Sequence, residues 1–525
     1  MFEEKLKGKY LWGMAFALFV AACGVKWFYL AQQHYHILLT DEALHAFDFS
    51  EFKEIKELLR RLFCDCDYTL GSVRPFFTNL LYILTFKVVA YQPQAVLVMG
   101  IFVGSLLVPL YFLTVAALVN VEVALAASVI VLWMTNYVYQ SISLTTILPG
   151  ILFITGALLA AVRYHKKGGS GCLYLSGFLI STSIFCRYEN VFLLPVFLGY
   201  ECLFDKKNGF FTKLAYGLLC FSSSLYILCC NYRLYGELFH MVRAETAQAV
   251  KHPGYGGPVP WSAAFGTAWE LLQQQFGLGP LPWAAAVAGM IFMLRRHKFR
   301  SLWLFLGVLP LSLFLIYKIR TDTLLNQKNY FLLLALIALS LGMEFLRVLF
   351  SGLCRRRICG IVALGLCAIY PVVSFHKANS SLGPRDTDLY FEPRLISLTE
   401  DLKSLPAGEA LYIDNALNRP GFYIQEVLVY SKRNPETYSY RRGVSEPPEK
   451  EYYLLTMDSL IDKLPQGDAV KVRDYRAYGF DGLALYRITR SINEKQKNAG
   501  GPAFEKTGGS SLQRSLPGKE FSSVG

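Results

Sequence analysis

The chain has 525 residues, of which 54% are apolar and 17% are charged, and it contains 38 Phe and 32 Tyr. This composition excludes an ordinary soluble globular protein of that length and indicates a chain built for lipid. Its formal net charge of +13 does not indicate nucleic-acid binding. The basic residues gather in short connections between apolar stretches, which the positive-inside rule expects of cytoplasmic loops. These basic clusters are 163–167, 206–213, 295–300 and 355–357.

Apolar stretches that approach the length of a bilayer span recur between residues 10 and 374. They are 10–30, 76–91, 95–119, 121–137, 147–163, 172–186, 190–204, 214–230, 281–294, 301–318, 329–350 and 358–374. The first is longer than the apolar core of a signal peptide, so we expect it to remain as a span. The sequence therefore predicts a polytopic α-helical membrane protein with a transmembrane domain at 1–375.

The basic clusters also predict a topology. Placing all four on the cytoplasmic side puts the N-terminus inside and the C-terminal region outside. The five stretches before the first cluster must then connect two cytoplasmic points, which an odd number of crossings cannot do. We therefore predict about 11 transmembrane helices, with the doubtful stretch between 95 and 163.

Two long loops are expected on the outer side. The first, 32–75, contains the segment 51–62, whose apolar residues recur at helical spacing opposite charged ones, as in an amphipathic helix on a membrane surface. The second, 231–280, contains the irregular segment HPGYGGPVPW at 252–261 and then a partly apolar stretch.

Composition changes after the last apolar stretch. Residues 376–490 predict a small extracytoplasmic α/β domain, because helical spacing alternates there with short β-type runs. The expected helices are 395–405 and 421–433, and the expected strands are 409–414, EYYLLTM, AVKVRDY and GLALYRI. Residues 491–525 have too few large apolar residues to fold, so we expect a disordered tail.

The chain has 12 cysteines, most of them in or beside apolar stretches, and none follows Cys367. We therefore expect no disulfide in the C-terminal domain. Cys64 and Cys66 stand in the first outer loop, where oxidation or metal binding is conceivable. Because two cysteines do not make a metal site, we predict an inert role for this pair.

An acidic pair, Asp41 and Glu42, follows the first apolar stretch, and His45 stands one helical turn further on. The residues alone allow two interpretations. One is an interfacial helix start with Thr40 as its N-cap. The other is a carboxylate that acts as a general base or holds a divalent metal against a phosphate.

These features, in this order, resemble the GT-C superfamily of membrane glycosyltransferases, which includes protein O-mannosyltransferases (glycosyltransferase family 39) and bacterial aminoarabinose transferases. TDEALHAF at 40–47 is similar to the first-loop acidic motif of that superfamily. FCRYENVFLLPVFLGY at 185–200 resembles its helical hairpin with an arginine at the outer tip. The segments 231–240 and 326–342 resemble later segments, so the resemblance covers most of 1–375.

The resemblance implies an inverting enzyme that takes a sugar from a polyprenyl-phosphate donor and passes it to a glycan, lipid or protein acceptor at the outer face. It places Asp41 at the position of the catalytic base, with Glu42 beside it. Cationic residues would stabilise the departing phosphate. The candidates for substrate binding are His45, Arg74, Arg187, Glu189, Arg320 and Lys328.

The four cations in this set could instead be interfacial anchors whose charged ends reach the headgroup region. They are Arg74, Arg187, Arg320 and Lys328. We expect Arg187, with Glu189 nearby, to face the protein interior instead. One departure from the superfamily concerns metal. Where many relatives carry a second acidic residue, this chain reads SISLTTILPG at 141–150, so a requirement for Mg or Mn stays open.

Two other classes of protein stay open. A lipid or solute transporter or flippase would favour internal repeats and ionisable residues near the midplane, whereas here the acids lie at the ends of the apolar stretches. An O-antigen polymerase or ligase would use a large late loop, for which His240, Arg243 and His252 are candidates. The cysteine-free outer domain and the single glycosylation sequon at Asn379 favour a bacterial inner membrane.

Overall fold

The computed structural model describes most of the chain between residues 2 and 489, with gaps. Apart from isolated positions, the described residues are 2–33, 55–66, 76–88, 93–142, 147–204, 209–240, 257–274, 280–295, 309–321, 331–353, 358–367, 393–406, 409–414, 437–438, 451–461, 468–478 and 480–489. They divide into a large helical unit and a small unit with a β-sheet, formed by 406–416 and residues from 435 onward.

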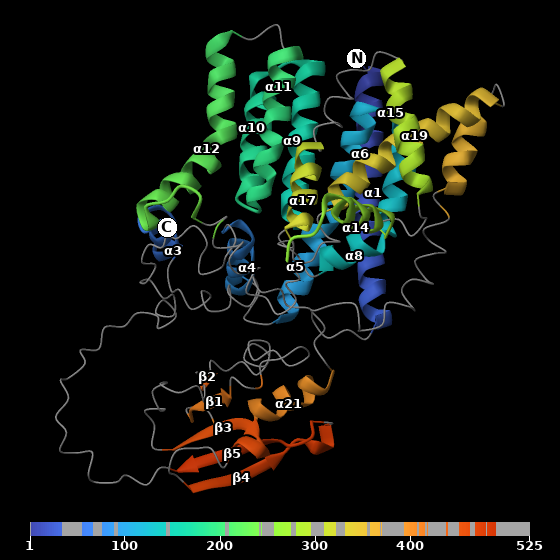
Figure 1. Cartoon of the computed structure of the whole chain (residues 1–525). Coiled ribbons are helices and arrows are strands. Elements are labelled where there is room, and N and C mark those ends of the chain that lie inside the picture. Colours follow the sequence, from blue (N-terminus) through green and yellow to red (C-terminus); the bar gives the residue numbers. More distant parts are fainter. Residues whose placement is uncertain are drawn as a thin grey trace. The chain divides into compact units, whose positions relative to one another are not determined.

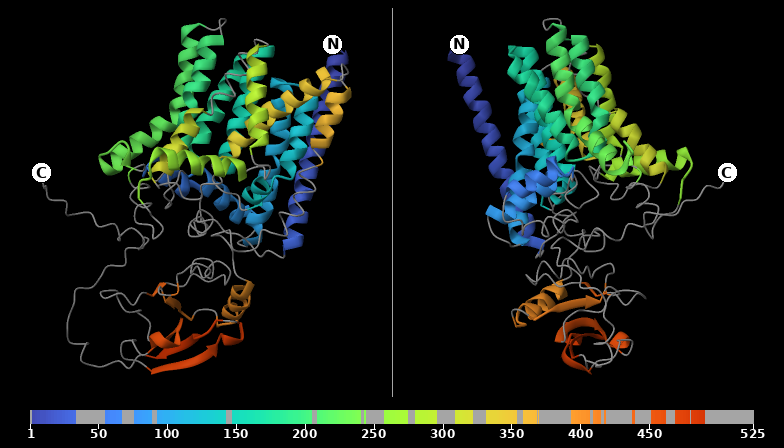
Figure 2. Two further views of the ribbon diagram at one scale, coloured as in Figure 1. Left: turned by 45° about the vertical axis from the view of Figure 1, so that its right-hand side comes forward. Right: turned by 90° about the vertical axis from the view of Figure 1, so that its left-hand side faces the viewer.

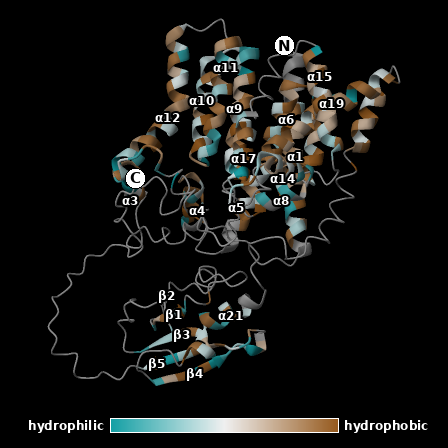
Figure 3. Cartoon of the chain, in the orientation of Figure 1, coloured by the Kyte–Doolittle hydropathy of each residue, from teal (hydrophilic) through white to brown (hydrophobic). Residues whose placement is uncertain are grey.

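The helical unit contains many helices that run beside one another (Figure 1). Its elements are α1 (Phe2–Gln33), α3 (Ile55–Phe63), α4 (Phe77–Val88), α5 (Pro93–Ser105), α6 (Leu107–Leu118), α7 (Val121–Leu132), α8 (Thr135–Ile142), α9 (Ile147–Lys167), α10 (Ser170–Ile184), the 3-10 helix η1 (Tyr188–Leu193), α11 (Leu194–Phe204), α12 (Phe210–Tyr235), α14 (Trp261–Gln274), α15 (Leu281–Arg295), α17 (Leu309–Arg320), α19 (Leu332–Leu353) and α21 (Pro393–Lys403). Many residues along these helices are hydrophobic (Figure 3).

Helix α1 exposes large aromatic side chains, as expected of a helix that contacts lipid. Trp12, Phe16 and Trp27 expose 57%, 68% and 64% of their surface. Such rings are costly to expose to water along a whole helix but suit contact with hydrocarbon and with the headgroup region.

Within the described residues, five helices are long and apolar enough to cross a membrane, or six when one bent pair is counted as a span. They are Tyr10–Leu30, Leu97–Leu118, Ile147–Lys167, Phe210–Tyr235 and Leu332–Leu353, with Val121–Leu132 and Asn136–Ile142 as the bent pair. Shorter apolar helices occupy Ser170–Ile184, Leu281–Arg295 and Ile358–Cys367. The predicted apolar stretches thus coincide with helices, whereas the number of 11 crossings stays a prediction.

The doubtful stretch between 95 and 163 corresponds to an irregularity in the structure. Helices α7 and α8 meet at a bend of 72° near Trp133, which describes either a broken span or a re-entrant segment. Helix α7 starts regularly, because the Asn120 side chain accepts a hydrogen bond from the Val123 N–H at 2.9 Å.

One end of the helical unit, here called the basic end, gathers the start of α1 with the C-terminal ends of α6, α9 and α11. The guanidinium of Arg163 lies 5.6 Å from the centre of the Trp12 ring. The Nε2 atom of His165 lies 3.0 Å from Oε1 of Glu201, and both side chains are buried. The C-terminal ends of α9 and α11 therefore lie at the same end of the helical unit (Figure 2), while the side of the membrane on which the basic clusters lie stays a prediction.

The opposite end, here called the hairpin end, gathers the turn between α10 and η1 with α3, α4 and the C-terminal ends of α12 and α17. The Phe185 ring lies 5.7 Å from that of Tyr226 on α12. The Phe77 N–H donates to the Phe185 carbonyl at 3.1 Å, so α4 begins against the end of α10. In both views of Figure 2, α3 and α4 lie away from the N-terminal end of α1.

Helix α1 is anchored to its neighbours by a buried lysine. The Lys26 ammonium donates to Ser105 Oγ at 2.9 Å and to the Tyr137 hydroxyl at 2.8 Å. The Tyr137 hydroxyl in turn donates to the Gly104 carbonyl at 2.6 Å. A buried cation needs such partners, and here they join α1 to α5 and α8.

The predicted amphipathic helix of the first loop is present as α3. Its Leu58 and Leu62 are 2% and 1% exposed, whereas Leu59 and Phe63 stay exposed. The Tyr226 hydroxyl donates to the Leu62 carbonyl, which fixes α3 to α12. The apolar face of α3 is thus covered in part by the protein itself, and the expectation of a helix that simply rests on lipid needs that correction.

The small unit contains a five-stranded sheet in the order β2-β1-β3-β5-β4. Its elements are β1 (Leu411–Asp414), β2 (Thr437–Tyr438), β3 (Glu451–Met457), α23 (Asp458–Ile461), β4 (Asp468–Asp474), η4 (Arg476–Tyr478) and β5 (Leu483–Thr489). β1 pairs in parallel with β2 and β3, while β5 pairs antiparallel with β3 and β4.

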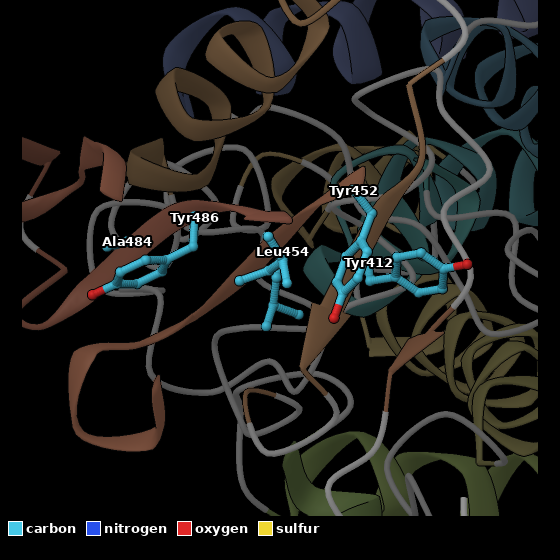
Figure 4. Packing of buried hydrophobic residues seen from close by; sticks show 6 residues of the cluster. Tyr412, Tyr452, Leu454, Ala484 and Tyr486 are labelled. Carbon is cyan, nitrogen blue, oxygen red and sulfur yellow. The ribbon is translucent and has the colours of Figure 1, made fainter. Parts of the chain in front are cut away.

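The expected strands of this unit are confirmed, as is the helix at 395–405, which is α21 of the helical unit. The expected helix at 421–433 lies outside the described residues. One face of the sheet is packed with Tyr412, Tyr452, Leu454, Ala484 and Tyr486 (Figure 4), together with Ile488. Alternation along β3 and β5 produces this face, because successive side chains point to opposite sides of a strand.

Candidate active site at the hairpin end

The turn between α10 and η1 brings charged residues into the protein. Helix α10 ends at Ile184, and Arg187 follows in an extended conformation with φ −154° and ψ 131° as the residue before η1. The Asn190 N–H bonds to the Arg187 carbonyl at 3.2 Å, which closes the first turn of η1. Pro195 then stands in the first turn of α11, where a missing N–H costs nothing.

A buried asparagine holds this turn against the helices. The Asn190 Nδ2 donates to the Ser183 carbonyl at 2.8 Å, which satisfies an acceptor at the end of α10. Gly150 on α9 makes room for it, because a Cβ atom there would lie 2.9 Å from Asn190 Nδ2. The turn is therefore set by packing as well as by its own hydrogen bonds.

Three charged side chains meet beneath the turn, and we call Arg187, Glu189 and Lys318 the Glu189 cluster. The Arg187 Nε lies 3.4 Å from Glu189 Oε2, and the Lys318 Nζ lies 3.2 Å from Glu189 Oε1. At residue level Arg187, Glu189 and Lys318 are 6%, 6% and 7% exposed. One carboxylate thus serves two cations, so the three side chains together carry one net positive charge.

Arg320, two residues beyond Lys318, extends the positive charge toward α14. Its guanidinium lies 4.8 Å from the centre of the Trp261 ring, and its carbonyl accepts from the Val259 N–H at 2.8 Å. Its Nε is buried and has no hydrogen-bond partner among the described residues. A buried donor of that kind is available to an oxygen acceptor that enters the site.

This arrangement suits an anionic group more than a cationic one. Arginine and lysine donate several hydrogen bonds to phosphate oxygens, and burial strengthens such interactions. Within the described part of the chain, no three His, Cys, Asp or Glu side chains gather closely enough to hold a metal ion. The requirement for a metal therefore stays open.

The structure brings together three of the predicted site residues at one end of the helical unit. Arg187 faces the protein interior, as expected, and contacts Glu189, while Arg320 lies at the end of α17. The others lie outside the described residues, so their roles stay predictions: Asp41, Glu42, His45, Arg74 and Lys328.

Two residues of the site were not singled out from the sequence. Lys318 stands at the end of an apolar stretch, where it looks like an interfacial anchor, and its contact with Glu189 joins positions 129 residues apart. Trp261 is the last residue of the segment HPGYGGPVPW. Its contact with the Arg320 guanidinium, which is seen only in the structure, places it at the site. The one available signal was the recurrence of two cations, Lys318 and Arg320, at the end of one stretch.

Comparison with solved structures shows that this chain shares its fold with two known proteins. The crystal structure of ArnT from Cupriavidus metallidurans bound to undecaprenyl phosphate matches with a TM-score of 0.58 and 12% identity, over 90% of this chain and 97% of that one. Its apo state gives a TM-score of 0.57 with 12% identity and the same coverages, 90% and 97%.

An oligosaccharyltransferase has a similar fold. The oligosaccharyltransferase of Archaeoglobus fulgidus in its apo form matches with a TM-score of 0.51 and 10% identity, over 82% of this chain and 65% of that one. No protein-family model matches the sequence, and no curated protein matches it. The likeness is therefore one of fold.

Proposed function

We propose that this chain is a membrane glycosyltransferase that moves a hexosyl or pentosyl group from a polyprenyl-phosphate donor to an acceptor at the outer face of the membrane. The fold shared with ArnT along 90% of the chain carries the proposal, since that protein binds undecaprenyl phosphate. The cations at the hairpin end supply what such a donor requires, because a phosphate monoester leaves with negative charge.

In the proposed reaction the acceptor hydroxyl oxygen attacks the anomeric carbon from the face opposite the phosphate, so the configuration inverts. The bond between that carbon and the phosphate oxygen breaks, and both electrons leave with the polyprenyl phosphate. Asp41 takes the proton of the acceptor hydroxyl as general base, with Glu42 beside it. His45, Arg74 and Lys328 belong to the same proposal as substrate-binding groups.

The Glu189 cluster and Arg320 bind the phosphate in this scheme. Glu189 keeps Arg187 and Lys318 oriented before the donor arrives, and preorganised cations stabilise developing charge without the cost of reorienting during the reaction. Arg74 precedes Phe76 by two residues in the chain, and the Phe76 ring lies 4.8 Å from that of Phe185 at the tip of the hairpin. Arg74 itself lies outside the described residues, and its assignment to the same phosphate follows from the resemblance of the sequence motifs.

We further propose that the hairpin end faces the extracytoplasmic side of a bacterial inner membrane, with the N-terminus in the cytoplasm. The basic end then lies on the cytoplasmic side, in agreement with the positive-inside rule. The C-terminal domain would be extracytoplasmic, and the acceptor would be a glycan, a lipid or a protein.

The test is an assay of the purified protein in detergent with a panel of polyprenyl-phosphate sugars. We expect wild type to release polyprenyl phosphate from at least one donor, and Asp41→Asn to lower the rate about 100-fold or more, because general-base catalysis contributes roughly that much. Asp48→Asn, seven residues further along the same loop, is the matched control and should keep the wild-type rate.

Two results would contradict the proposal. Full transfer by Asp41→Asn would remove Asp41 as the base. Failure to consume any lipid-linked donor, together with movement of a lipid or solute across vesicles that contain the protein, would replace the transferase by a transporter.

A further inference from the structure

A second cluster at the hairpin end joins the first loop to α12 and involves two buried thiols. After α3 the chain reverses, with the Cys64 and Asp65 N–H groups both bonding to the Arg60 carbonyl at 2.7 and 3.1 Å. Cys66 then lies in the left-handed region at φ 57°, which residues other than glycine seldom adopt. This conformation turns the chain so that Cys66 is 7% exposed, although Cys64 stays exposed.

The partner surface is the C-terminal part of α12. Cys230, which is 1% exposed, lies one helical turn from both Tyr226 and Arg233, and these two residues contact α3 and the turn after it. The Arg233 Nη1, one helical turn beyond Cys229, donates to Cys66 Sγ at 3.6 Å. Cys229, next to Cys230, points outward and is exposed. Cys66 and Cys230, far apart in sequence, thus lie at the same packed junction between the first loop and α12, and each has an exposed cysteine close by in the chain.

A strained backbone conformation persists only where its surroundings hold it. Here the surroundings are the packing of α3 on α12, which includes the Phe63 and Tyr226 rings with centres 5.9 Å apart. The thiol pair therefore does not meet by chance at a mobile surface. It sits where a covalent link would fasten the first loop, the loop that carries the proposed catalytic base, to the helical unit.

We propose that Cys66 and Cys230 are a thiol pair that is oxidised to an intramolecular disulfide joining the first loop to α12. The extracytoplasmic orientation on which this rests is part of the proposed function, since disulfides persist in oxidising compartments. Neither the nature of the sugar nor the identity of the catalytic base enters the inference.

The oxidant is a disulfide compound, such as oxidised glutathione or the active-site disulfide of a thiol oxidoreductase. The Cys66 thiolate attacks one sulfur of that disulfide, forming a mixed disulfide and releasing one thiolate, which takes up the proton from Cys66. The Cys230 thiolate then attacks the Cys66 sulfur of the mixed disulfide and expels the second thiolate, which takes up the proton from Cys230. Two thiols of the chain lose two electrons in all, and the oxidant is reduced to two thiols.

Arg233 favours this sequence because a cation beside sulfur stabilises the thiolate that performs the attack. Burial of the finished contact implies that oxidation takes place before α3 packs on α12, or during its transient release. The finished disulfide is then shielded from reductants, as a structural rather than a labile bond would be.

The test is peptide mapping of the full-length protein, alkylated in its native membranes before solubilisation, and again after purification in detergent with oxidised glutathione. We expect a disulfide-linked peptide pair containing Cys66 and Cys230 in wild type. The same pair should be found in the controls Cys64→Ser and Cys229→Ser, which change the neighbouring exposed cysteines, and should be missing from Cys66→Ser and Cys230→Ser.

Alkylation of both Cys66 and Cys230 in the oxidised wild-type protein would overturn the proposal, as would a link that contains Cys64 or Cys229. Wild type and the two control variants decide the matter even where Cys66→Ser or Cys230→Ser fails to fold. The donor assay is a separate measurement, so loss of the disulfide with normal donor consumption would refute this inference alone, whereas a disulfide without donor consumption would refute the transferase alone.

Discussion

The two ends of the helical unit solve the burial of charge in different ways. At the basic end each buried carboxylate faces one basic partner, His165 for Glu201 and Arg347 for Glu344. At the hairpin end Glu189 is shared by two cations, and Arg320 adds a third nearby. Among the described residues, each of these two acids of the basic end has one basic partner, whereas Glu189 is flanked by two.

We interpret the ion pairs of the basic end as structural and the Glu189 cluster as part of a binding site. Arg347 bonds Glu344 through both Nε and Nη2, at 2.8 and 3.1 Å, and the Asn120 side chain donates to the same carboxylate at 3.1 Å. Such a closed arrangement satisfies its own polar groups and needs nothing further. Two buried cations that share one carboxylate offer several hydrogen-bond donors in one place, which makes the Glu189 cluster a candidate anion site.

The largest effect should come from Arg187→Ala. The change leaves Glu189 paired with Lys318, so the fold should persist, while the rate of sugar transfer should fall roughly 100-fold through the loss of a phosphate contact. Arg347→Ala is the counterpart at the basic end. It leaves a fully buried carboxylate without its cation, which costs about 3–5 kcal/mol of stability, but transfer per folded molecule should stay at the wild-type rate.

These two variants are compared by transfer rate per folded molecule and by thermal unfolding in detergent. The distinction between the two ends fails if Arg187→Ala loses stability without losing rate, or if Arg347→Ala loses rate in its folded fraction.

The next effect concerns the carboxylates. Glu189→Gln should destabilise the protein by about 3–5 kcal/mol, because it leaves two neighbouring cations without their shared anion. Glu201→Gln should cost less, about 1–3 kcal/mol, because the amide that replaces the carboxylate can still hydrogen-bond to the His165 ring. Thermal unfolding measures the loss of stability of both variants. An equal or larger loss for Glu201→Gln would show that Glu189 is not needed to neutralise Arg187 and Lys318.

A smaller effect is expected of Arg320→Gln. Loss of one cation from the edge of the site should raise the KM for the donor about tenfold, equivalent to about 1.4 kcal/mol, with little change in kcat. Trp261→Leu removes the ring but keeps the charge, so its KM should rise by about threefold at most. Steady-state kinetics distinguishes the two, and identical KM values for wild type and Arg320→Gln would exclude Arg320 from the site.

The smallest effect lies in the C-terminal domain and should not touch transfer. Hydrogen bonds from Tyr486 and Lys471 lower the pKa of Asp458 below its ordinary value of 3.8. Burial, together with the bond to Asp458, raises the pKa of Tyr486 to about 12. Because the Asp458 pKa is lowered by folding, its contribution to stability is complete above roughly pH 5 and is lost as the pH falls through the folded-state pKa.

Asp458→Asn should therefore reduce the stability of the sheet by roughly 0.5 kcal/mol at neutral pH, and the difference from wild type should vanish in acid. Hydrogen exchange of peptides from β4 and β5, corrected for the intrinsic exchange rate at each pH, measures it in the full-length protein. A difference that grows as the pH falls would contradict the assigned ionisation.

The sequence predicted the parts that depend on local pattern. Apolar runs marked the helices and alternation marked β3 and β5, whereas the stretch 121–137, expected to be continuous, is broken between α7 and α8. The motif FCRYENVF also predicted that Arg187 would face inward, because the short distance to Glu189 is itself local.

Contacts between distant positions could not be predicted in the same way. Nothing in the residues around Lys318 indicates Glu189, and nothing around Cys66 indicates Cys230, because helix packing brings these positions together. For the same reason the hydrogen bonds from Lys26 to Ser105 and Tyr137 could not be predicted. In the sequence, Lys26 is only a single charged residue within an apolar stretch.

The central claim, that the hairpin end binds the phosphate of a lipid-linked donor, is tested most directly by native mass spectrometry with undecaprenyl phosphate. The account predicts one bound lipid per chain for wild type and for Arg347→Ala, with the affinity of Arg187→Ala reduced at least tenfold, or about 1.4 kcal/mol. Equal binding by Arg187→Ala, or equal binding of a polyprenol that lacks the phosphate, would contradict it.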